Sequence, residues 1–309
     1  MKLKLFLKQY YWYQRLSAEI KRLIVKIDPE KEFARCYRQS FHHEPNLKEP
    51  RDFVEKVGWM ELHTDTSLWS LCTDKYRVRE YINKKGFGEY LPKLLGHWSN
   101  ANDIDFDTLP NKFVLKTNNG CATVYVVKNK SEENLKKLRK LLNRWLKLPF
   151  GYYNAELHYT KIEPCIIAEE FLLQDEYEQK ISPNSLIDYK MYCFAGKPEC
   201  TWIAYDRTHA AVKMALMDMQ WNVMEKEMKL NSHYHYHPEI KIPKPKCFDK
   251  MLEIASKLSS EFPEVRVDFY VINDKPYIGE LTFSSGYGFF TQEYYNYLGD
   301  LVVLPQKIK

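Results

Sequence analysis

The chain contains Arg266-Val267-Asp268-Phe269-Tyr270 and, a few residues later, Ile278-Gly279-Glu280-Leu281-Thr282-Phe283. Both runs are rich in β-branched and aromatic residues, and Asn273-Asp274-Lys275 between them has the composition of a turn, so the sequence predicts a β-hairpin. A turn of three residues would set Asp268 directly opposite Glu280, with both side chains on one face of the hairpin.

Two carboxylates held opposite each other repel unless a cation lies between them. Mg²⁺ takes a few carboxylate oxygens, keeps some waters and completes its shell with phosphate oxygens. Asp268 and Glu280, flanked by Arg266, therefore predict a site for a magnesium-bound nucleotide. The alternative is a surface hairpin with two solvated acids.

The overall composition is that of an ordinary globular protein, because 45% of the 309 residues are hydrophobic and 28% are charged. The net charge of +5 is concentrated in residues 1–28, which hold seven basic and two acidic side chains, whereas the rest of the chain is neutral. A neutral body argues against an extended nucleic-acid-binding face, so we expect no nucleic acid among the partners.

The seven cysteines are scattered singly without C-x-x-C spacing, which indicates a reducing compartment. No apolar run approaches the ~20 residues that cross a bilayer. Charged residues interrupt the first helix where a signal peptide would be apolar. We therefore expect a cytoplasmic protein, with peripheral attachment to the inner face of the cytoplasmic membrane as a second option.

Apolar residues recur at spacings of three and four through residues 2–27, and basic residues lie between them. This pattern predicts an amphipathic helix. Such a helix can lie on an anionic membrane surface. It can equally dock on its own domain with its lysines and arginines in water. The sequence leaves both options open.

The rest of the chain alternates between helices and strands. Helices are predicted over 31–42, 75–85 (capped by Asp74), 131–148 (capped by Ser131) and 249–262, and further strands over 111–116, 123–128, 165–172, 187–194 and 200–205. Residues 206–247 are predicted to be irregular. This order favours an α+β protein with antiparallel sheets over a doubly wound parallel sheet. We expect a helical region over 1–70, a first lobe over 71–172 and a second lobe over 173–309 that carries the acidic hairpin.

Three more segments place polar residues at strand ends. Lys116 precedes the turn Asn118-Asn119-Gly120, and a lysine with open backbone N–H groups suits a phosphate chain. Glu169-Glu170-Phe171 ends a buried strand whose backbone can pair with an adenine edge. Asp188 and Lys190 share one face of a strand and can hold a ribose hydroxyl and a phosphate. Each also has an ordinary interpretation: a lysine beside a turn, a strand entering solvent, an exposed ion pair.

His233, His235 and His237 alternate along one segment and could share a zinc ion, although an aromatic edge strand or a loop explains them better because no Cys or carboxylate stands at ligand spacing. The motifs G-x-S-x-G, H-E-x-x-H and G-x-G-x-x-G are absent from the sequence. Their absence favours chemistry in which metal ions and fixed cations stabilise a transferring phosphoryl group.

Taken in order, these segments resemble the ATP-grasp superfamily, and more closely its TupA-like branch of teichuronopeptide, capsule and O-antigen biosynthesis proteins. The resemblance covers residues 50–305. It rests on Pro50-Arg51-Asp52-Phe53-Val54-Glu55-Lys56, Thr73-Asp74-Lys75-Tyr76-Arg77-Val78-Arg79, Leu109-Pro110-Asn111-Lys112-Phe113-Val114-Leu115-Lys116, Asp188-Tyr189-Lys190, Phe194-Ala195-Gly196-Lys197-Pro198, the two runs of the hairpin, and Gly286-Tyr287-Gly288-Phe289.

The resemblance implies an ATP-grasp fold, in which two α+β lobes clamp ATP, preceded here by a helical extension. It implies ATP and Mg²⁺ as cofactors. The residues that would contact the nucleotide are Lys75 or Arg79, Lys116 and Gly120 at the phosphates, Glu169, Glu170 and Phe171 at the adenine hinge, and Asp188 at the ribose. The metal ligands would be Asp268, Glu280 and Thr282. Lys190, at the nucleotide phosphates, and Arg266, at the reacting carboxylate and γ-phosphate, would be the catalytic residues.

The activity implied is that of an ATP-dependent carboxylate–amine ligase that forms an amide through an acyl phosphate. Its carboxylate would be a uronic acid or an amino-acid substituent, small or part of a lipid-linked glycan, and the product a cell-surface polysaccharide. The alternatives are a glycosyltransferase of capsule or O-antigen synthesis and a degenerate nucleotide-binding or scaffold protein without turnover. The sequence does not decide the substrates or the oligomeric state.

Two positions depart from the family's pattern. The superfamily usually carries Glu-x-Asn where this chain has Glu280-Leu281-Thr282. A threonine hydroxyl is a weaker ligand than an asparagine carbonyl, which weakens the case for a second Mg²⁺. Ser284-Ser285 stands where relatives often carry a proline, so the loop on the substrate side is expected to differ.

Overall fold

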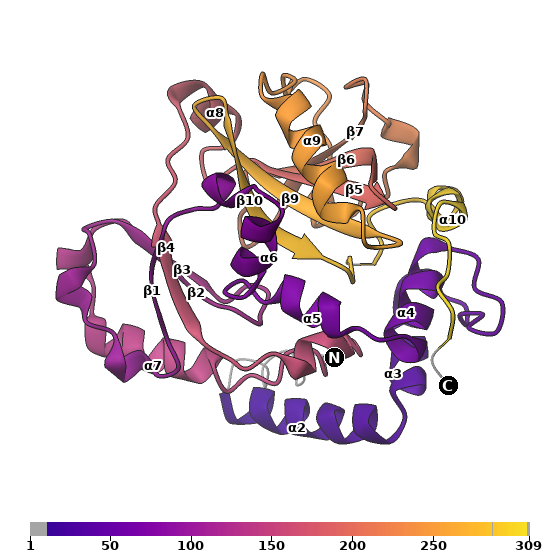
Figure 1. The fold of residues 1–309 in the computed structure, drawn as a ribbon, viewed down its shortest axis with the longest axis horizontal. Coiled ribbons are helices and arrows are strands. Elements are labelled where there is room, and N and C mark those ends of the chain that lie inside the picture. Colours follow the sequence, from indigo (N-terminus) through magenta and orange to yellow (C-terminus); the bar gives the residue numbers. More distant parts are fainter. Residues whose placement is uncertain (1–10, 286, 308–309) are drawn as a thin grey trace.

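The computed structural model describes residues 11–285 and 287–307, and for residues 11–15 it describes the backbone alone. Residues 2–10 of the expected first helix and Gly286 of the last family motif lie outside the described residues. Within the described part of the chain, two largely antiparallel sheets are surrounded by helices (Figure 1). None of the helices in this part is long and apolar enough to cross a membrane.

The described helices are α2 (Tyr11–Ile27), α3 (Pro29–Phe41), α4 (Phe53–His63), α5 (Ser67–Thr73), α6 (Val78–Lys84), α7 (Leu135–Trp145), α8 (Glu176–Ile181), α9 (Phe248–Ser259) and α10 (Gln292–Asp300). The described strands are β1 (Leu94–Trp98), β2 (Phe113–Thr117), β3 (Val124–Val127), β4 (Ile166–Glu170), β5 (Asp188–Phe194), β6 (Lys197–Tyr205), β7 (Val212–Asp218), β8 (Tyr234–His235), β9 (Val265–Ile272) and β10 (Lys275–Thr282).

Helices α4 and α10, from opposite ends of the chain, pack together. A capping box starts α4, because the Asp52 carboxylate accepts the Glu55 N–H and the Glu55 carboxylate accepts the Asp52 N–H. Gly299 of α10 lies so close that a Cβ there would be 2.1 Å from the Arg51 carbonyl oxygen. The Lys56 ammonium donates to the Gly299 carbonyl at 2.8 Å. The close approach therefore requires a glycine at position 299.

Sheet A, the smaller sheet, has the strand order β1-β4-β2-β3 and is antiparallel throughout. Phe113, Leu115, Ile166 and Ala168 line one face and pack with α7. By alternation, Lys116 and Glu169 belong to the opposite face. The predicted start of α7 at Ser131 is wrong: the helix begins at Leu135, after Asn134 accepts the Lys137 N–H, and Ser131 lies in a preceding 3₁₀ turn.

Sheet B has the order β10-β9-β5-β6-β7-β8. Helix α9 packs on β5, β6 and β9 through apolar residues such as Met251 and Leu258. Strand β7 lies inside residues 206–247, so the prediction of an irregular segment there is wrong. Strand β8 pairs parallel to β7 at the sheet edge and contains His235, as expected for an aromatic edge strand. The described residues contain no group of three or more His, Cys, Asp or Glu side chains able to hold a metal ion.

The predicted hairpin is β9–β10, and its register sets Asp268 opposite Glu280 as expected. The turn, however, has two residues instead of three. Ile272 pairs with Lys275, and Asn273 and Asp274 both have positive φ, 51° and 61°, as a type I′ turn requires. The pairing shifts by one residue at Gly279, which forms a β-bulge. Without this shift, a two-residue turn would place Gly279 opposite Asp268; with it, Glu280 takes that position.

Candidate active site

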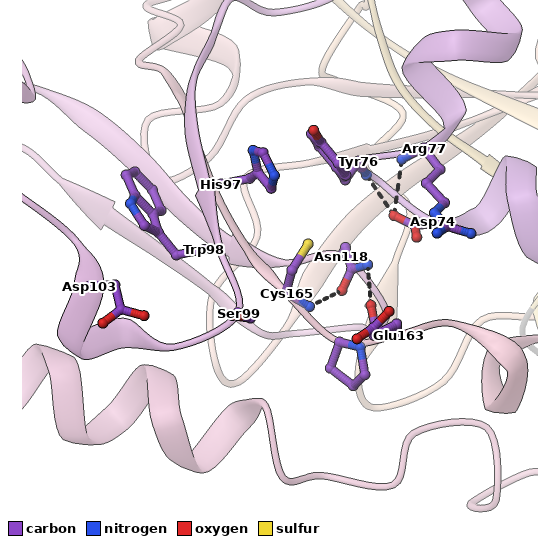
Figure 2. Close-up of a pocket in the computed structure, with 11 residues that line it drawn as sticks. Asp74, Tyr76, Arg77, His97, Trp98, Ser99, Asp103, Asn118, Glu163 and Cys165 are labelled. Atoms are coloured by element: carbon purple, nitrogen blue, oxygen red, sulfur yellow. Dashed lines mark hydrogen bonds between the residues drawn. The ribbon is translucent and has the colours of Figure 1, made fainter.

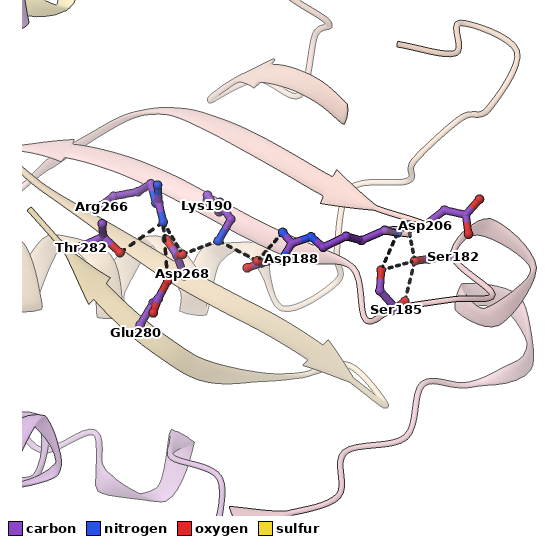
Figure 3. Close-up of polar contacts among 10 residues, drawn as sticks. Ser182, Ser185, Asp188, Lys190, Asp206, Arg266, Asp268, Glu280 and Thr282 are labelled. Atoms are coloured by element: carbon purple, nitrogen blue, oxygen red, sulfur yellow. Dashed lines mark hydrogen bonds and ion pairs between the residues drawn. The ribbon is translucent and has the colours of Figure 1, made fainter. Parts of the chain in front are cut away.

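Five charged side chains, here called the charge row, lie side by side on neighbouring strands of sheet B (Figure 3). Strand pairing aligns Lys190 of β5 with Asp268 of β9, and Asp268 with Glu280 of β10. The Lys190 ammonium lies 2.6 Å from Asp188 Oδ2 and 2.5 Å from Asp268 Oδ2. The Arg266 guanidinium donates to both Asp268 oxygens at 2.7 Å. The charges alternate along the row: Asp188, Lys190, Asp268, Arg266, Glu280.

Glu280 ends the charge row and is its most accessible carboxylate, with 32% of its side chain exposed against 2% for Asp268. Its Oε1 lies 3.7 Å from the nearest Arg266 nitrogen. The Lys75 ammonium lies 3.3 Å from Glu280 Oε2 and donates to the Gly120 carbonyl at 3.0 Å. Lys75 therefore links the loop between β2 and β3 of sheet A to the hairpin of sheet B.

The local fold around Asp74 explains how Lys75 reaches the hairpin. Asp74 was expected to cap a helix from Lys75, but α6 begins only at Val78. The Asp74 carboxylate instead accepts the N–H groups of Tyr76 and Arg77 and holds a tight turn. This turn leaves Lys75 outside the helix.

The charge row favours the charged forms of Lys190 and Glu280. Burial favours neutral Lys190, but Asp188 and Asp268 outweigh it and raise the Lys190 pKa above its usual value. Burial also opposes charge on Glu280, yet Lys75, Lys190 and Arg266 hold the Glu280 pKa well below its ordinary range. At neutral pH Lys190 is therefore a cation and Glu280 an anion.

A second cluster forms on sheet A around Glu169, whose side chain is 8% exposed. Lys116 lies 2.5 Å and Arg79 2.8 Å from its two oxygens. Burial raises the Glu169 pKa, but Lys116 and Arg79 more than compensate, so the pKa is lowered. Lys116 and Arg79, which were expected to contact the nucleotide phosphates, thus form ion pairs with Glu169, which was expected at the adenine hinge.

The other expected hinge residues lie beside this cluster and outside its ion pairs. The Glu170 carboxylate accepts the Lys93 N–H at 2.8 Å, and Phe171 is the half-buried residue directly after β4. Thr282 is opposite Arg266 on the hairpin, and its hydroxyl accepts from Arg266 at 3.2 Å.

The donor set of the hairpin suits a single hard cation. The Glu280 side chain is partly exposed, and Asp268 Oδ1 accepts one hydrogen bond where a carboxylate oxygen can accept two. Asp268 Oδ2 is already contacted by both Arg266 and Lys190. These residues could hold Mg²⁺ through Glu280 and one oxygen of Asp268, with water and phosphate oxygens in the remaining positions.

Sequence reasoning missed several side chains that join these groups. Arg207 lies 3.5 Å from Asp188 and extends the charge row by one cation. In the hairpin of β5 and β6, Asp188 pairs with Ala204, and Arg207 follows Ala204 by three residues. This short separation is the sequence signal from which the contact between Arg207 and Asp188 could have been predicted. The Ser284 hydroxyl donates to Glu156 at 2.6 Å, and Arg266 approaches the Ser285 hydroxyl at 3.5 Å.

A cavity of about 430 Å³ lies beside the turn that carries Lys75 (Figure 2). Asp74, Arg77 and the stacked rings of Tyr76 and His97, 4.1 Å apart, help to line it. None of the site residues predicted from the sequence lines this cavity.

The sequence was compared with models of known protein families, and the TupA-like ATPgrasp model matches residues 55–303. The chain belongs to this family. The match spans most of the chain and includes both sheets, so the α+β ATP-grasp fold predicted from the sequence is confirmed. No curated protein matches the chain.

Several solved structures are similar to this one. The D-alanine–D-alanine ligase from Bacillus anthracis complexed with ATP has 14% identity and a TM-score of 0.48, over 78% of this chain and 67% of the ligase. The ATP-grasp ligase PsnB complexed with a minimal precursor has 11% identity and a TM-score of 0.43, over 80% and 66%. The L-amino acid ligase from Bacillus licheniformis has 12% identity and a TM-score of 0.40, over 70% and 41%.

Proposed function

We propose that this protein is a Mg²⁺-requiring, ATP-dependent carboxylate–amine ligase that forms an amide through an acyl phosphate. The observation that carries the proposal is the charge row of sheet B, which ends in the accessible Glu280 and is met there by Lys75, whose ammonium also donates to the Gly120 carbonyl in the loop between β2 and β3. Membership of the TupA-like ATPgrasp family supports ATP as the nucleotide.

The reaction would take two steps. An oxygen of the substrate carboxylate bonds to the γ-phosphorus of ATP, and the bond from that phosphorus to ADP breaks. The amine nitrogen then attacks the acyl carbon, phosphate leaves with the carbon–oxygen electron pair, and the amine loses a proton. Such chemistry requires positioning, neutralisation of phosphoryl charge and exclusion of water.

In this proposal the cations of the chain carry most of the catalysis. Arg266 stabilises the reacting carboxylate and γ-phosphate, while Lys190, Lys75 and Lys116 contact nucleotide phosphates. Asp268 and Glu280 would hold Mg²⁺, with the Thr282 hydroxyl beside them as the weaker third oxygen, and the bound ion would neutralise charge on the phosphates. Asp268 has a further role in this scheme, because its two ion pairs fix the direction of Arg266 and Lys190.

The substrate assignment rests on the resemblance to the TupA-like branch. We propose that the carboxylate belongs to a uronic acid or an amino acid, free or within a lipid-linked glycan, and that the product is a modified cell-surface polysaccharide. An ADP-release screen of uronic acids against amino acids would test the assignment. Release that needs both a carboxylate and an amine supports the ligase, and release with neither class argues against it.

Nucleotide binding can be tested by thermal shift with Mg-ADP, Mg-ATP and Mg-UDP. A ligand at 100 times its dissociation constant stabilises the folded state by about 2.7 kcal/mol, so binding should raise the melting temperature clearly. We expect stabilisation by the adenine nucleotides that is lost in Asp268→Ala. Because Asp268 is buried and holds two cations, Glu280→Gln is the better second variant, since its side chain is partly exposed.

The outcomes separate the alternatives. A shift with UDP alone would favour a glycosyltransferase. No shift with any nucleotide would favour a scaffold protein without turnover. A shift with adenine nucleotides that survives chelation of Mg²⁺ and persists in Glu280→Gln would overturn the metal assignment.

A further inference from the structure

Helix α2 docks on its own domain through one face and leaves the opposite face uncovered. Ala18 and Val25 are buried, and the Lys21 ammonium donates to the Tyr153 carbonyl at 2.7 Å. The Arg22 guanidinium lies over the Tyr152 ring, 5.9 Å from its centre. The residues that anchor the helix are thus small apolar side chains and two cations.

The large aliphatic residues of α2 face outward. Their spacing of three, four and seven positions places them on one stripe of the helix, here called the α2 stripe. Its members are Leu16, Ile20, Leu23, Ile24 and Ile27, with 53%, 51%, 61%, 41% and 84% of their surfaces exposed. If α2 docked on the domain through this stripe with its lysines and arginines in water, the aliphatic residues would be buried, which is the reverse of what the structure shows. A continuous exposed aliphatic stripe of this size is characteristic of an interaction surface.

The charge around the α2 stripe is complementary to an anionic surface. On α2 itself, Lys26 is exposed. Helix α7 lies along the same lower edge of the molecule as α2 (Figure 1) and exposes Lys136, Lys137 and Lys140 without an acidic residue between Leu135 and Lys147. Tyr152 and Tyr153, which follow α7, form the contact with α2.

We infer that the α2 stripe inserts into the headgroup region of an anionic lipid bilayer, with Lys26 of α2 and the exposed lysines of α7 at the lipid phosphates. The apolar face would supply burial and the lysines electrostatic attraction, the two contributions that hold interfacial helices on membranes. The inference does not depend on the proposed reaction.

The full chain should be tested by co-sedimentation with vesicles of phosphatidylcholine and phosphatidylglycerol, and with phosphatidylcholine alone. We expect binding to the anionic vesicles that weakens in high salt. The variant Ile20→Gln/Leu23→Gln/Ile27→Gln should lose at least about tenfold in affinity, because three apolar side chains no longer enter the lipid. The control Leu173→Gln/Val223→Gln/Val303→Gln removes three other exposed apolar residues and should bind as the parent does.

Several results would overturn the inference. These are no binding by the full chain, equal binding by the stripe variant and its control, and a dimer in solution that the stripe variant converts to monomer, which would assign the stripe to a second copy. The variant Lys136→Glu/Lys140→Glu should weaken binding to anionic vesicles. Unchanged binding would show that α7 is not part of the membrane-binding surface.

Discussion

Lys190 is the buried cation on which the charge row depends. Its ammonium is shared by Asp188 and Asp268 at 2.6 and 2.5 Å, and 8% of the side chain is exposed. Replacing a buried ion pair as a whole can be neutral, but removing one partner leaves an uncompensated charge. The loss of unfolding free energy when Lys190 is replaced therefore tests whether these ion pairs form.

Lys190→Met should cost about 3–5 kcal/mol of unfolding free energy, because Asp188 and Asp268 would lose the buried ammonium that both contact. Urea denaturation would measure the loss. The matched control is Lys213→Met, which removes the partner of Asp206 at 2.8 Å with 30% of the lysine exposed, and should cost less than about 1 kcal/mol. Equal losses in the two variants would contradict the buried ion network.

Glu178 of α8 predicts a pH dependence of stability. Burial, followed by the charge of Asp175, raises its pKa from 4.5 to about 7. Between these values the folded state binds more protons than the unfolded state, so Glu178 lowers stability as pH rises from 4.5 to 7. Above about pH 7 the Glu178 carboxylate is ionised in both the folded and the unfolded state, so its destabilising effect no longer grows with pH.

Glu178→Gln should therefore raise the melting temperature at about pH 8 and leave it unchanged near about pH 4. Glu176→Gln, on the same helix and exposed, is the control and should have little effect at either pH. A lower melting temperature for Glu178→Gln at the higher pH would show that the ionised carboxylate is stabilising.

At the scale of elements, close packing of α10 on α4 gives a further prediction. Gly299→Ala should lose about 1–3 kcal/mol, because the new methyl group would meet the Arg51 carbonyl and the Asp52 backbone, which cannot rotate away. This loss should exceed the gain of about 1 kcal/mol in helix propensity. Glu293→Ala, exposed on the same helix, should change stability by less than about 0.5 kcal/mol. Equal melting temperatures for the two variants would contradict the packing.

Strands with local signals were predictable, and those fixed by tertiary pairing were not. The hairpin was found because β-branched and aromatic residues flank a turn, although neither the type I′ turn nor the bulge at Gly279 was foreseen. Strand β7 was missed because its sequence, Val212-Lys213-Met214-Ala215-Leu216-Met217-Asp218, is rich in helix formers. Pairing with β6 and burial override that preference.

At the scale of the molecule, contacts from distant segments converge on the hairpin β9–β10 and the residues after it. Lys75 reaches Glu280, and Ser284 reaches Glu156 across 128 residues. The order of motifs along the chain was sufficient to predict the ATP-grasp fold, because that order is the family's own. The order of motifs did not predict the hydrogen bond between Ser284 and Glu156 or the ion pairs of Glu169 with Lys116 and Arg79. Side chains that meet in space have no fixed spacing in the sequence.

The charge row and the α2 stripe belong to different parts of the molecule, so nucleotide binding should not require α2. Residues 28–309 alone should unfold cooperatively at a slightly lower temperature, since α2 buries mainly Ala18 and Val25 and donates through Lys21. Thermal shift would compare this truncated chain with the full chain, and Mg-ADP should raise both melting temperatures equally. A truncated chain that unfolds cooperatively but does not respond to Mg-ADP would show that α2 supports the nucleotide site. A chain that no longer unfolds cooperatively would show that α2 is needed for the fold itself.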